Sequence, residues 1–331
     1  MNHVTKNNTT YIFKSVPIKN IDVDDQLTSF SLGIPTIPLQ KSIEEVGVIH
    51  PVTLVPLGNR FRIVCGHRRV KIASQLKTNE IQARILDPAP SEESMLMLNL
   101  SENQFLHQYS DIEKGFILSK LCEINVPQIR IIEKYMPMLG LEKSKKLLGD
   151  YLSANQLTTG LKTLLHEMNV PLRTFSVFFN WSSESAEAAE RFFSTLRPGI
   201  NKWRDLLEWI DEISTRDETT PSDLFELPEL QSTLNQNDLA PNVRYDRIRQ
   251  IFYSRRYPIL SDLRIRLARS LDALKLDDKT KVHVQDSFES DEIRIEMKFR
   301  TREEFVNQVE KLVRASDSEA LDELIRIFKY P

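Results

Sequence analysis

The stretch that decides the fold of the first third of the chain is residues 64–73, Val64-Cys-Gly-His-Arg-Arg-Val-Lys-Ile-Ala73. Its residue types predict a strand before Gly66 and a helix after it. Free backbone N–H groups and the helix dipole attract anions at such a helix start, and Arg68 and Arg69 add two full charges. The stretch therefore indicates a phosphate-binding site, and the alternative is an arginine pair at a solvated helix end.

Further strands and helices surround this stretch and predict a small α/β domain over residues 10–106, after a polar tail at 1–9 that is expected to be disordered. Alternation of residue types, helical spacing and turn residues mark these elements. In chain order they are a strand from Tyr11 to Ile18, a helix from Pro38 to Val46, strands at 52–55 and 60–65 around Leu57-Gly58-Asn59, a strand from Ile81 to Leu86, and a helix opened by Ser91.

The rest of the chain predicts three more parts. Residues 107–215 show helical spacing throughout and predict an all-α domain. Residues 216–240 lie in a region, Asp205 to Asp238, that carries ten acidic residues against Arg216, and they predict an acidic linker. Residues 241–331 predict an α+β module with strands near 281–284 and 292–299 and helices at 302–314 and 317–329. The predicted fold class is α+β multidomain.

Composition narrows the functional class without naming a partner. The net charge of −3 across 331 residues favours neither nucleic acid nor an acidic surface as a partner. Any prediction of a partner must therefore come from local clusters of charge. Two cysteines with no pairing pattern fit a reducing compartment. No apolar run is long enough to span a bilayer, and the sequence predicts a cytoplasmic protein without membrane contact.

Two blocks resemble the N-terminal domain of ParB proteins. The first is residues 42–69, Ser-Ile-Glu-Glu-Val-Gly-Val-Ile-His-Pro-Val-Thr-Leu-Val-Pro-Leu-Gly-Asn-Arg-Phe-Arg-Ile-Val-Cys-Gly-His-Arg-Arg, and it matches a helix, a Gln-Pro-Ile-type strand, a hairpin and a Gly-Glu-Arg-Arg motif. His50 stands for the usual Gln and His67 for the usual Glu. The second is residues 102–114, similar to a Glu-Asn-x-Gln-Arg run before a helix. The resemblance covers roughly residues 10–155.

The resemblance implies that the domain binds CTP with a magnesium ion. The nucleotide-binding positions that it implies are His50, Gly66, His67, Arg68 and Arg69. The implied metal ligands are Glu102 and Asn103, whose oxygen atoms suit magnesium; the alternative is a polar helix end exposed to water. Phe105 and Leu106 replace the polar pair of the family motif, so nucleotide binding is expected and hydrolysis, as a weak CTPase, is less so.

An enzymatic alternative comes from the same fold. Cys65-Gly66-His67-Arg68 looks similar to the Gly-Cys-His-Arg motif of sulfiredoxin, but aligning His-Arg places Gly66 at the catalytic cysteine position. Strand alternation turns Cys65 to the opposite face, which indicates a packed residue. The alternative function is therefore a ParB/sulfiredoxin-fold enzyme, a nucleotide-dependent phosphotransferase or nuclease, that binds no specific DNA.

The resemblance also predicts a helix-turn-helix between Pro127 and Asn155. A short helix from Gln128 to Met136, a turn at Pro137 and Gly140, and a second helix from Glu142 are expected. The DNA-binding candidates at the start of the second helix are Lys143, Ser144, Lys145 and Lys146. The alternatives are a solvated surface helix and, for Ser144, a local helix cap.

A second candidate for contact with the DNA backbone is residues 244–269, where eight arginines face two aspartates, Asp246 and Asp262. Its alternative is an exposed helix face that pairs with the acidic linker. The aromatic residues between Phe175 and Trp209 follow helical spacing and predict a core rather than a base-stacking surface. The resemblance further implies a homodimer, a Walker-type ATPase partner, double-stranded DNA and a nucleoid-associated role in chromosome or plasmid partitioning or related regulation.

Overall fold

A computed structural model describes residues 10–30, 32, 37–103, 107–236, 238–284 and 292–329. The predicted disordered tail, 1–9, lies outside the described residues. The chain divides into two compact units, Met1–Asp211 with Thr219–Leu227, and Glu212–Glu218 with Pro228–Pro331. The first unit contains residues of both predicted domains, 10–106 and 107–215, up to Asp211. The α+β multidomain class is confirmed, and across the described residues no helix is both long and apolar enough to cross a membrane.

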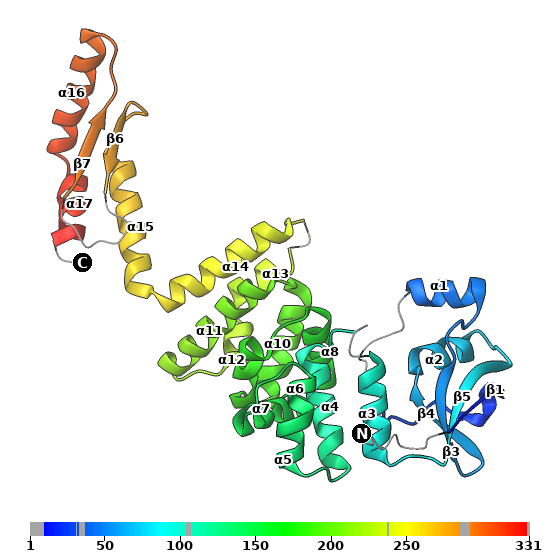
Figure 1. The fold of residues 1–331 in the computed structure, drawn as a ribbon. Helices are drawn as coiled ribbons and strands as arrows, with labels where there is room; N and C mark the ends of the chain where they lie inside the picture. Colours follow the sequence, from blue (N-terminus) through cyan, green and yellow to red (C-terminus); the bar gives the residue numbers. More distant parts are fainter. Residues whose placement is uncertain are drawn as a thin grey trace, which may run out of the picture. The chain divides into compact units, whose positions relative to one another are not determined.

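A mixed five-stranded sheet forms the N-terminal part of the first unit, with the strand order β1-β5-β3-β4-β2 (Figure 1). Strands β1 and β5 are antiparallel, as are β3 and β4, whereas β5 pairs with β3 and β2 with β4 in parallel. Their bounds are β1 Thr10–Pro17, β2 Ile21–Asp22, β3 Val52–Leu57, β4 Arg60–Cys65 and β5 Glu80–Asp87. The two-residue strand β2 is the one strand of this sheet that sequence patterns did not predict.

Helices cover both faces of this sheet. On one face, Val70 and Ala73 of α2 (His67–Gln75) pack against Leu54 of β3, and α1 (Ile37–Val46) lies beside α2. On the other face, Met95 of α3 (Glu92–Asn103) packs against Leu86 of β5. Because alternate side chains of a strand point to opposite faces, β3, β4 and β5 each contribute to both of these cores.

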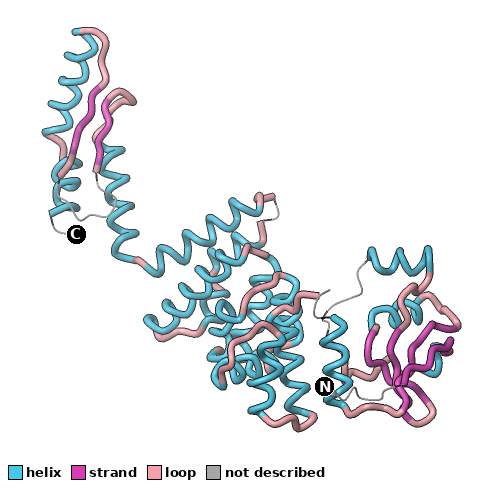
Figure 2. The backbone as a smooth tube through the Cα atoms, viewed as in Figure 1, coloured by secondary structure: helices cyan, strands magenta, loops and turns pink. Residues whose placement is uncertain are grey.

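The remainder of the first unit is helical, as predicted (Figure 2). Phe193 stacks on Trp203 with ring centroids 3.7 Å apart, and both side chains are completely buried. The prediction that the aromatic residues form a helical core is therefore confirmed. The helices are α4 Asp111–Glu123, α7 Lys145–Asn155, α8 Thr159–Glu167, α9 Leu172–Phe175, α10 Ser183–Leu196, α11 Ile200–Asp217 and α12 Pro221–Phe225, with a 3-10 turn, η3, at Ser176–Asn180.

The predicted helix-turn-helix differs from the structure at its turn. The first helix consists of α5 (Gln128–Arg130), a π-helical turn η2 (Ile131–Tyr135) and α6 (Met136–Met138), so it continues through Pro137. Proline is tolerated there because it lies in the first turn of α6, directly after the π-helical turn, where a missing N–H costs little. The prediction that Pro137 makes the turn is wrong. The second helix, α7, begins at Lys145 instead of Glu142.

The stretch 216–240, predicted as an acidic linker, contains two short helices. Thr220 caps α12 with a reciprocal capping box to Asp223, and Phe225 at its end is buried. Helix α13 (Pro228–Leu234) buries Leu230. Acidic composition predicted a flexible connector, but capping residues and a few well-placed apolar side chains are enough to order these turns.

The second unit ends in the predicted α+β module. Helices α14 (Pro241–Arg256) and α15 (Pro258–Ala273) precede the antiparallel pair β6 (Thr280–His283) and β7 (Arg294–Met297). Helices α16 (Arg302–Ser316) and α17 (Glu319–Lys329) follow. Leu263 and Leu267 of α15 share a core with Leu324 and Ile327 of α17.

Candidate functional site

Gly66 connects β4 to α2 in a conformation that other residues rarely adopt. It is the residue before α2, and its φ of 102° lies in the left-handed region. A Cβ atom at this position would lie 2.8 Å from Val52 Cγ1 and 3.0 Å from Arg69 Nη2. The glycine therefore allows the chain to turn directly from the strand into the helix and keeps the first N–H groups of α2 accessible.

A pocket of about 460 Å³ opens beside this helix start. It brings together four of the predicted nucleotide-binding residues, Gly66, His67, Arg68 and Arg69, with Asn103 of the predicted metal pair. The further lining residues are Thr28, Ser29, Phe30, Leu39, Asn99, His107 and Tyr109. Its volume lies in the range of about 300 to 1,000 Å³ that is usual for small-molecule sites.

Arg68 is the cation of this pocket that remains available to a ligand. Its side chain lines this pocket and also an adjoining one of about 380 Å³, which Lys71 shares. Among the residues that the structure describes, the buried Nε atom of Arg68 has no hydrogen-bond partner. An unpaired buried donor costs about 1–3 kcal/mol, so Arg68 gains little from its contacts within the described residues.

Arg69 has a different environment from its neighbour. Its Nη1 atom donates to the backbone carbonyls of His50 at 2.5 Å and Pro51 at 3.1 Å, and its Nη2 lies 3.5 Å from Glu102 Oε1. Burial lowers the pKa of Arg69, and Glu102 opposes that shift. Arg69 thus fastens the start of β3 to α2. The predicted residue His50 takes part through its carbonyl oxygen, and its ring does not line the pocket.

Both residues of the predicted metal pair make contacts within the protein. The Glu102 carboxylate is held between the guanidinium groups of Arg84 and Arg69. The Asn103 amide nitrogen donates at 2.9 Å to the Asn99 backbone carbonyl and to its side-chain oxygen. A carboxylate already paired with two arginines is a weaker ligand for a divalent cation than a free one, so magnesium binding by Glu102 stays a prediction.

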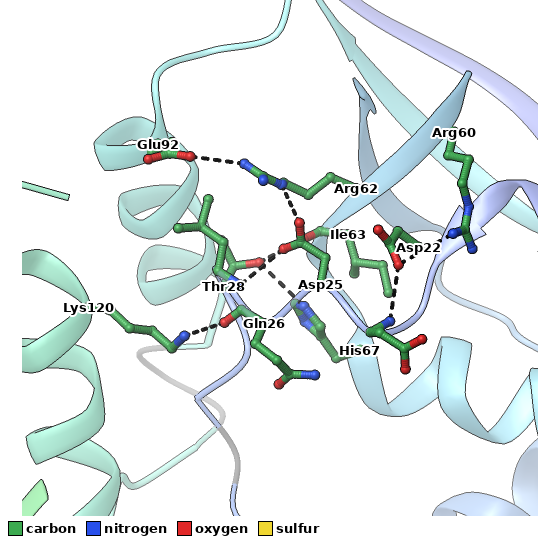
Figure 3. Close-up of polar contacts among 12 residues, drawn as sticks. Asp22, Asp25, Gln26, Thr28, Arg60, Arg62, Ile63, His67, Glu92 and Lys120 are labelled. Atoms are coloured by element: carbon green, nitrogen blue, oxygen red, sulfur yellow. Dashed lines mark hydrogen bonds and ion pairs between the residues drawn. The ribbon is translucent and has the colours of Figure 1, made fainter. Parts of the chain in front are cut away.

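His67 is held under a loop that crosses the start of α2 (Figure 3). Its Nε2 lies 3.4 Å from Thr28 Oγ1, and the same hydroxyl donates to the Ile63 carbonyl at 2.7 Å. The loop is fastened by Arg62, whose Nε donates to Asp25 Oδ2 at 2.6 Å. Burial lowers the pKa of His67 to about 4. The ring is therefore neutral at physiological pH and adds no positive charge to the site.

Sequence patterns missed the pocket residues that come from other elements. Asn99 is buried in α3, and its amide donates to the backbone carbonyls of Thr28 at 3.1 Å and Val64 at 2.6 Å. This single side chain joins the loop, the end of β4 and α3. One signal was present in the sequence, since a lone asparagine between Leu98 and Leu100 must find buried partners.

Cys65 is not equipped for nucleophilic chemistry. The residue is buried, and desolvation together with the nearby Glu102 raises the pKa of its thiol well above the ordinary value. A thiolate nucleophile needs the opposite environment, with exposure and a lowered pKa. The structure therefore agrees with the interpretation of Cys65 as a packed strand residue.

The candidate DNA-binding residues lie together at the start of α7. Ser144 caps the helix by accepting from Leu147 N at 3.2 Å, which agrees with its predicted alternative as a local cap. Lys143 lies before the helix and pairs with Glu133 at 2.6 Å. Lys145 and Lys146 are exposed in the first turn. The structure thus places two of the three lysines in the helix and one outside it.

The arginine-rich stretch 244–269 occupies α14 and α15 and pairs in part with acidic residues. Arg255 contacts Glu229 at 3.0 Å, and Arg256 contacts Glu212 at 2.6 Å. These pairs match the predicted alternative in which arginines neutralise the acidic stretch. Arg264, in contrast, is exposed and lies over the Tyr253 ring at 5.3 Å.

Comparisons with known proteins find similarity to ParB proteins in the first part of the chain. The profile of the ParB N-terminal domain matches residues 4–104. A probable chromosome-partitioning protein ParB of Coxiella burnetii is 27% identical over 130 residues, covering 39% of this chain and 42% of that protein. A probable plasmid-partitioning protein ParB of Thermus thermophilus is 33% identical over 60 residues, covering 18% and 20%. The chain thus spans less than half the length of these curated relatives.

Solved ParB structures show more distant likeness. The C-terminally truncated ParB of Caulobacter crescentus complexed with CTP-gamma-S is 15% identical with a TM-score of 0.26, covering 54% of this chain and 97% of that one. The same protein complexed to the centromeric parS site is 12% identical with a TM-score of 0.33, covering 59% and 98%. The sequence matches carry the comparison: residues 4–104 of this chain match the family model of the ParB N-terminal domain.

Proposed function

We propose that this chain is a ParB-type DNA-binding protein whose N-terminal domain binds a nucleoside triphosphate. The observation that carries the proposal is the position of Arg68, a cation with an unpartnered buried Nε atom on the wall of a pocket at the start of α2. Backbone N–H groups at a helix start and an adjacent guanidinium are the features that bind phosphate groups. The match of residues 4–104 to the family model of the ParB N-terminal domain supports the same conclusion.

Local charge favours a polyanion over a neutral ligand. Arg68 and Arg69 line the pocket. Of these two arginines Glu102 pairs only with Arg69, and Glu102 itself does not line the pocket. His67 contributes no charge because its pKa is lowered to about 4. The positive charge is therefore concentrated at Arg68 and the N-terminus of α2. The proposal assigns no magnesium ligand to Glu102.

CTP is the nucleotide proposed, because the family resemblance implies it and because the Caulobacter crescentus ParB was crystallised with a CTP analogue. Isothermal calorimetry with CTP, UTP, ATP and GTP tests this directly. Inorganic tripolyphosphate should compete with CTP, since Arg68 and the N-terminus of α2 are features that bind phosphate groups rather than a base. If none of the four nucleotides binds at millimolar concentration, the nucleotide site is refuted.

DNA binding is proposed to reside in α7. Lys145 and Lys146 stand at the positive end of the helix dipole, where cations destabilise the helix by a few tenths of a kcal/mol each. Their placement is therefore explained better by an external anion than by helix stability. Phosphate contacts from such residues would position the helix on duplex DNA. Gel shifts of a partition-site duplex at increasing salt test the proposal, and salt-independent binding would contradict it.

Partitioning of a chromosome or plasmid is the proposed cellular role, following the description of the two curated relatives. A homodimer, a Walker-type ATPase partner and a nucleoid-associated cytoplasmic location belong to the same proposal and rest on the family resemblance. Analytical ultracentrifugation tests the dimer. A strictly monomeric chain at concentrations of tens of micromolar would remove that part.

A further inference from the structure

Gly149 lies in the middle of α7, where a glycine is unfavourable for the helix itself. It is the fifth of the eleven residues from Lys145 to Asn155. A glycine at such a position destabilises a helix relative to alanine, because it gives the unfolded chain more conformational freedom. Its backbone is helical and its φ is not positive, so no turn requires a glycine here. The local structure of α7 therefore gives no reason for this residue.

Two other glycines in the described helices are explained by packing, and Gly149 is not. In α4, a Cβ atom on Gly115 would lie 2.9 Å from the Tyr151 carbonyl oxygen. In α8, a Cβ atom on Gly160 would overlap the Glu190 carboxylate. At Gly149 the same atom would meet nothing within 4 Å. The packing of the described residues therefore leaves the missing side chain at Gly149 unexplained.

The exposed face of α7 has Gly149 at its centre. With 3.6 residues per turn, Lys146, Gly149 and Ser153 follow one another along one side of the helix, and all three are exposed. Leu148 and Tyr151, on the opposite side, are buried. The midpoint of the exposed face thus carries no side chain, and a surface placed against this face can approach the helix backbone more closely at Gly149 than at its exposed neighbours.

The charge around this face favours a polyanion as the partner. Lys145 and Lys146 lie one turn before Gly149, and neither has an acidic partner among the described residues. The N-terminus of α7 adds a partial positive charge at the same end. Of the nearby acidic residues, Glu142 precedes the helix, and Asp150 is half-buried about a quarter turn away, at the edge of the face. A basic helix face with a bare midpoint suits the major groove of duplex DNA, which admits an α-helix.

We infer that Gly149 sets how deeply α7 enters the major groove of DNA, because it lets the helix backbone approach where a side chain would hold the helix off. The inference rests on the proposed DNA binding by α7, and it adds a residue that has neither charge nor hydrogen-bonding side chain. With the backbone this close, Lys145, Lys146 and Ser153 on the same face can reach phosphates or base edges. A helix held further away would lose part of these contacts.

Substitutions at Gly149 should act on stability and on DNA binding in opposite directions. Alanine and leucine both favour a helix over glycine, and a Cβ atom here has open space. Gly149→Ala and Gly149→Leu should therefore raise the melting temperature by about 1–4 °C. Gly149→Leu should weaken DNA binding by about tenfold or more, the scale of one lost base contact, and Gly149→Ala should have a smaller effect. Fluorescence anisotropy measures affinity for a duplex that wild-type protein selects from a random-sequence pool.

Gly199→Leu is the matched control, because a Cβ atom at Gly199 also meets nothing within 4 Å and the residue lies outside α7. It should leave DNA affinity unchanged. If Gly149→Leu binds the duplex as tightly as wild type, the inference is overturned, while phosphate contact by Lys145 and Lys146 stays testable through the salt dependence. A lower melting temperature of Gly149→Leu would also overturn it, since the fold would then need the glycine. If wild-type protein selects no duplex, the proposed DNA binding fails and this inference fails with it.

Discussion

Adjacent arginines at the start of α2 should respond differently to removal, and this difference is the sharpest test of the site. Arg68→Ala removes a guanidinium whose Nε has no acceptor in the part of the chain that the structure describes. The change should therefore weaken nucleotide binding by about 1.5–3 kcal/mol, or roughly 10- to 150-fold, as for other hydrogen bonds to charged groups. The free energy of unfolding should stay the same or rise slightly, because a buried unpaired donor is lost.

Arg69→Ala removes hydrogen bonds that the fold itself uses. The carbonyls of His50 and Pro51 lose their donor, and Glu102 keeps only Arg84. Two hydrogen bonds of about 0.5–1.5 kcal/mol each, discounted for partial exposure to water, predict a loss of about 1–2 kcal/mol in the free energy of unfolding. Urea unfolding followed by circular dichroism measures this loss, and calorimetry with CTP measures affinity in the same preparations.

If Arg68→Ala lowers stability as much as Arg69→Ala and leaves CTP affinity unchanged, then Arg68 is a structural residue and the site assignment is wrong. Arg173→Ala provides the matched control, because this arginine is exposed in α9 and outside the pocket. It should change neither measurement.

Three further predictions concern backbone, pH and DNA. Gly66→Ala should lower the free energy of unfolding by about 3 kcal/mol, because of the positive φ and the approach of Val52; urea unfolding at wild-type stability would contradict this. The pKa of His67 is about 4 in the folded protein and 6.5 in the unfolded chain, so the unfolded chain binds a proton first as pH falls. The contribution of His67 to the free energy of unfolding is therefore complete above pH 6.5 and is lost between pH 6.5 and 4. Wild type should lose on the order of 2 kcal/mol more than His67→Gln over that range, and parallel pH profiles would refute it. Replacing Lys145 and Lys146 by Gln should flatten the salt slope of DNA binding by about two units, and an unchanged slope would exclude α7 from phosphate contact.

Local sequence determined which segments become strands and helices in the first unit. Alternating apolar residues, the turn at Gly58, the break at Gly66 and helical spacing beyond it each act over a few residues, so the pattern is readable without neighbours. Ser91 at the start of α3 and Ser144 at the start of α7 are likewise recognisable from the local sequence as helix-capping residues. The predicted helix boundaries were less accurate near Pro137. A π-helical turn precedes the proline and lets the helix continue through it, and sequence patterns do not predict such a turn.

Tertiary structure decided which of the predicted site residues remain available to a ligand. Arg68 and Arg69 are adjacent residues of the same type, but packing treats them differently. Arg69 donates to two backbone carbonyls, whereas the Nε of Arg68 has no acceptor among the described residues. Glu102 has the residue type of a metal ligand, but Arg84 on β5 meets it from a strand eighteen residues earlier in the chain. His107 also lines the pocket, and its Nε2 lies 3.1 Å from the buried Glu113 Oε2. Residue type and local spacing are set by the sequence directly, whereas partners across the sheet depend on burial and register, which exist only once the chain has folded.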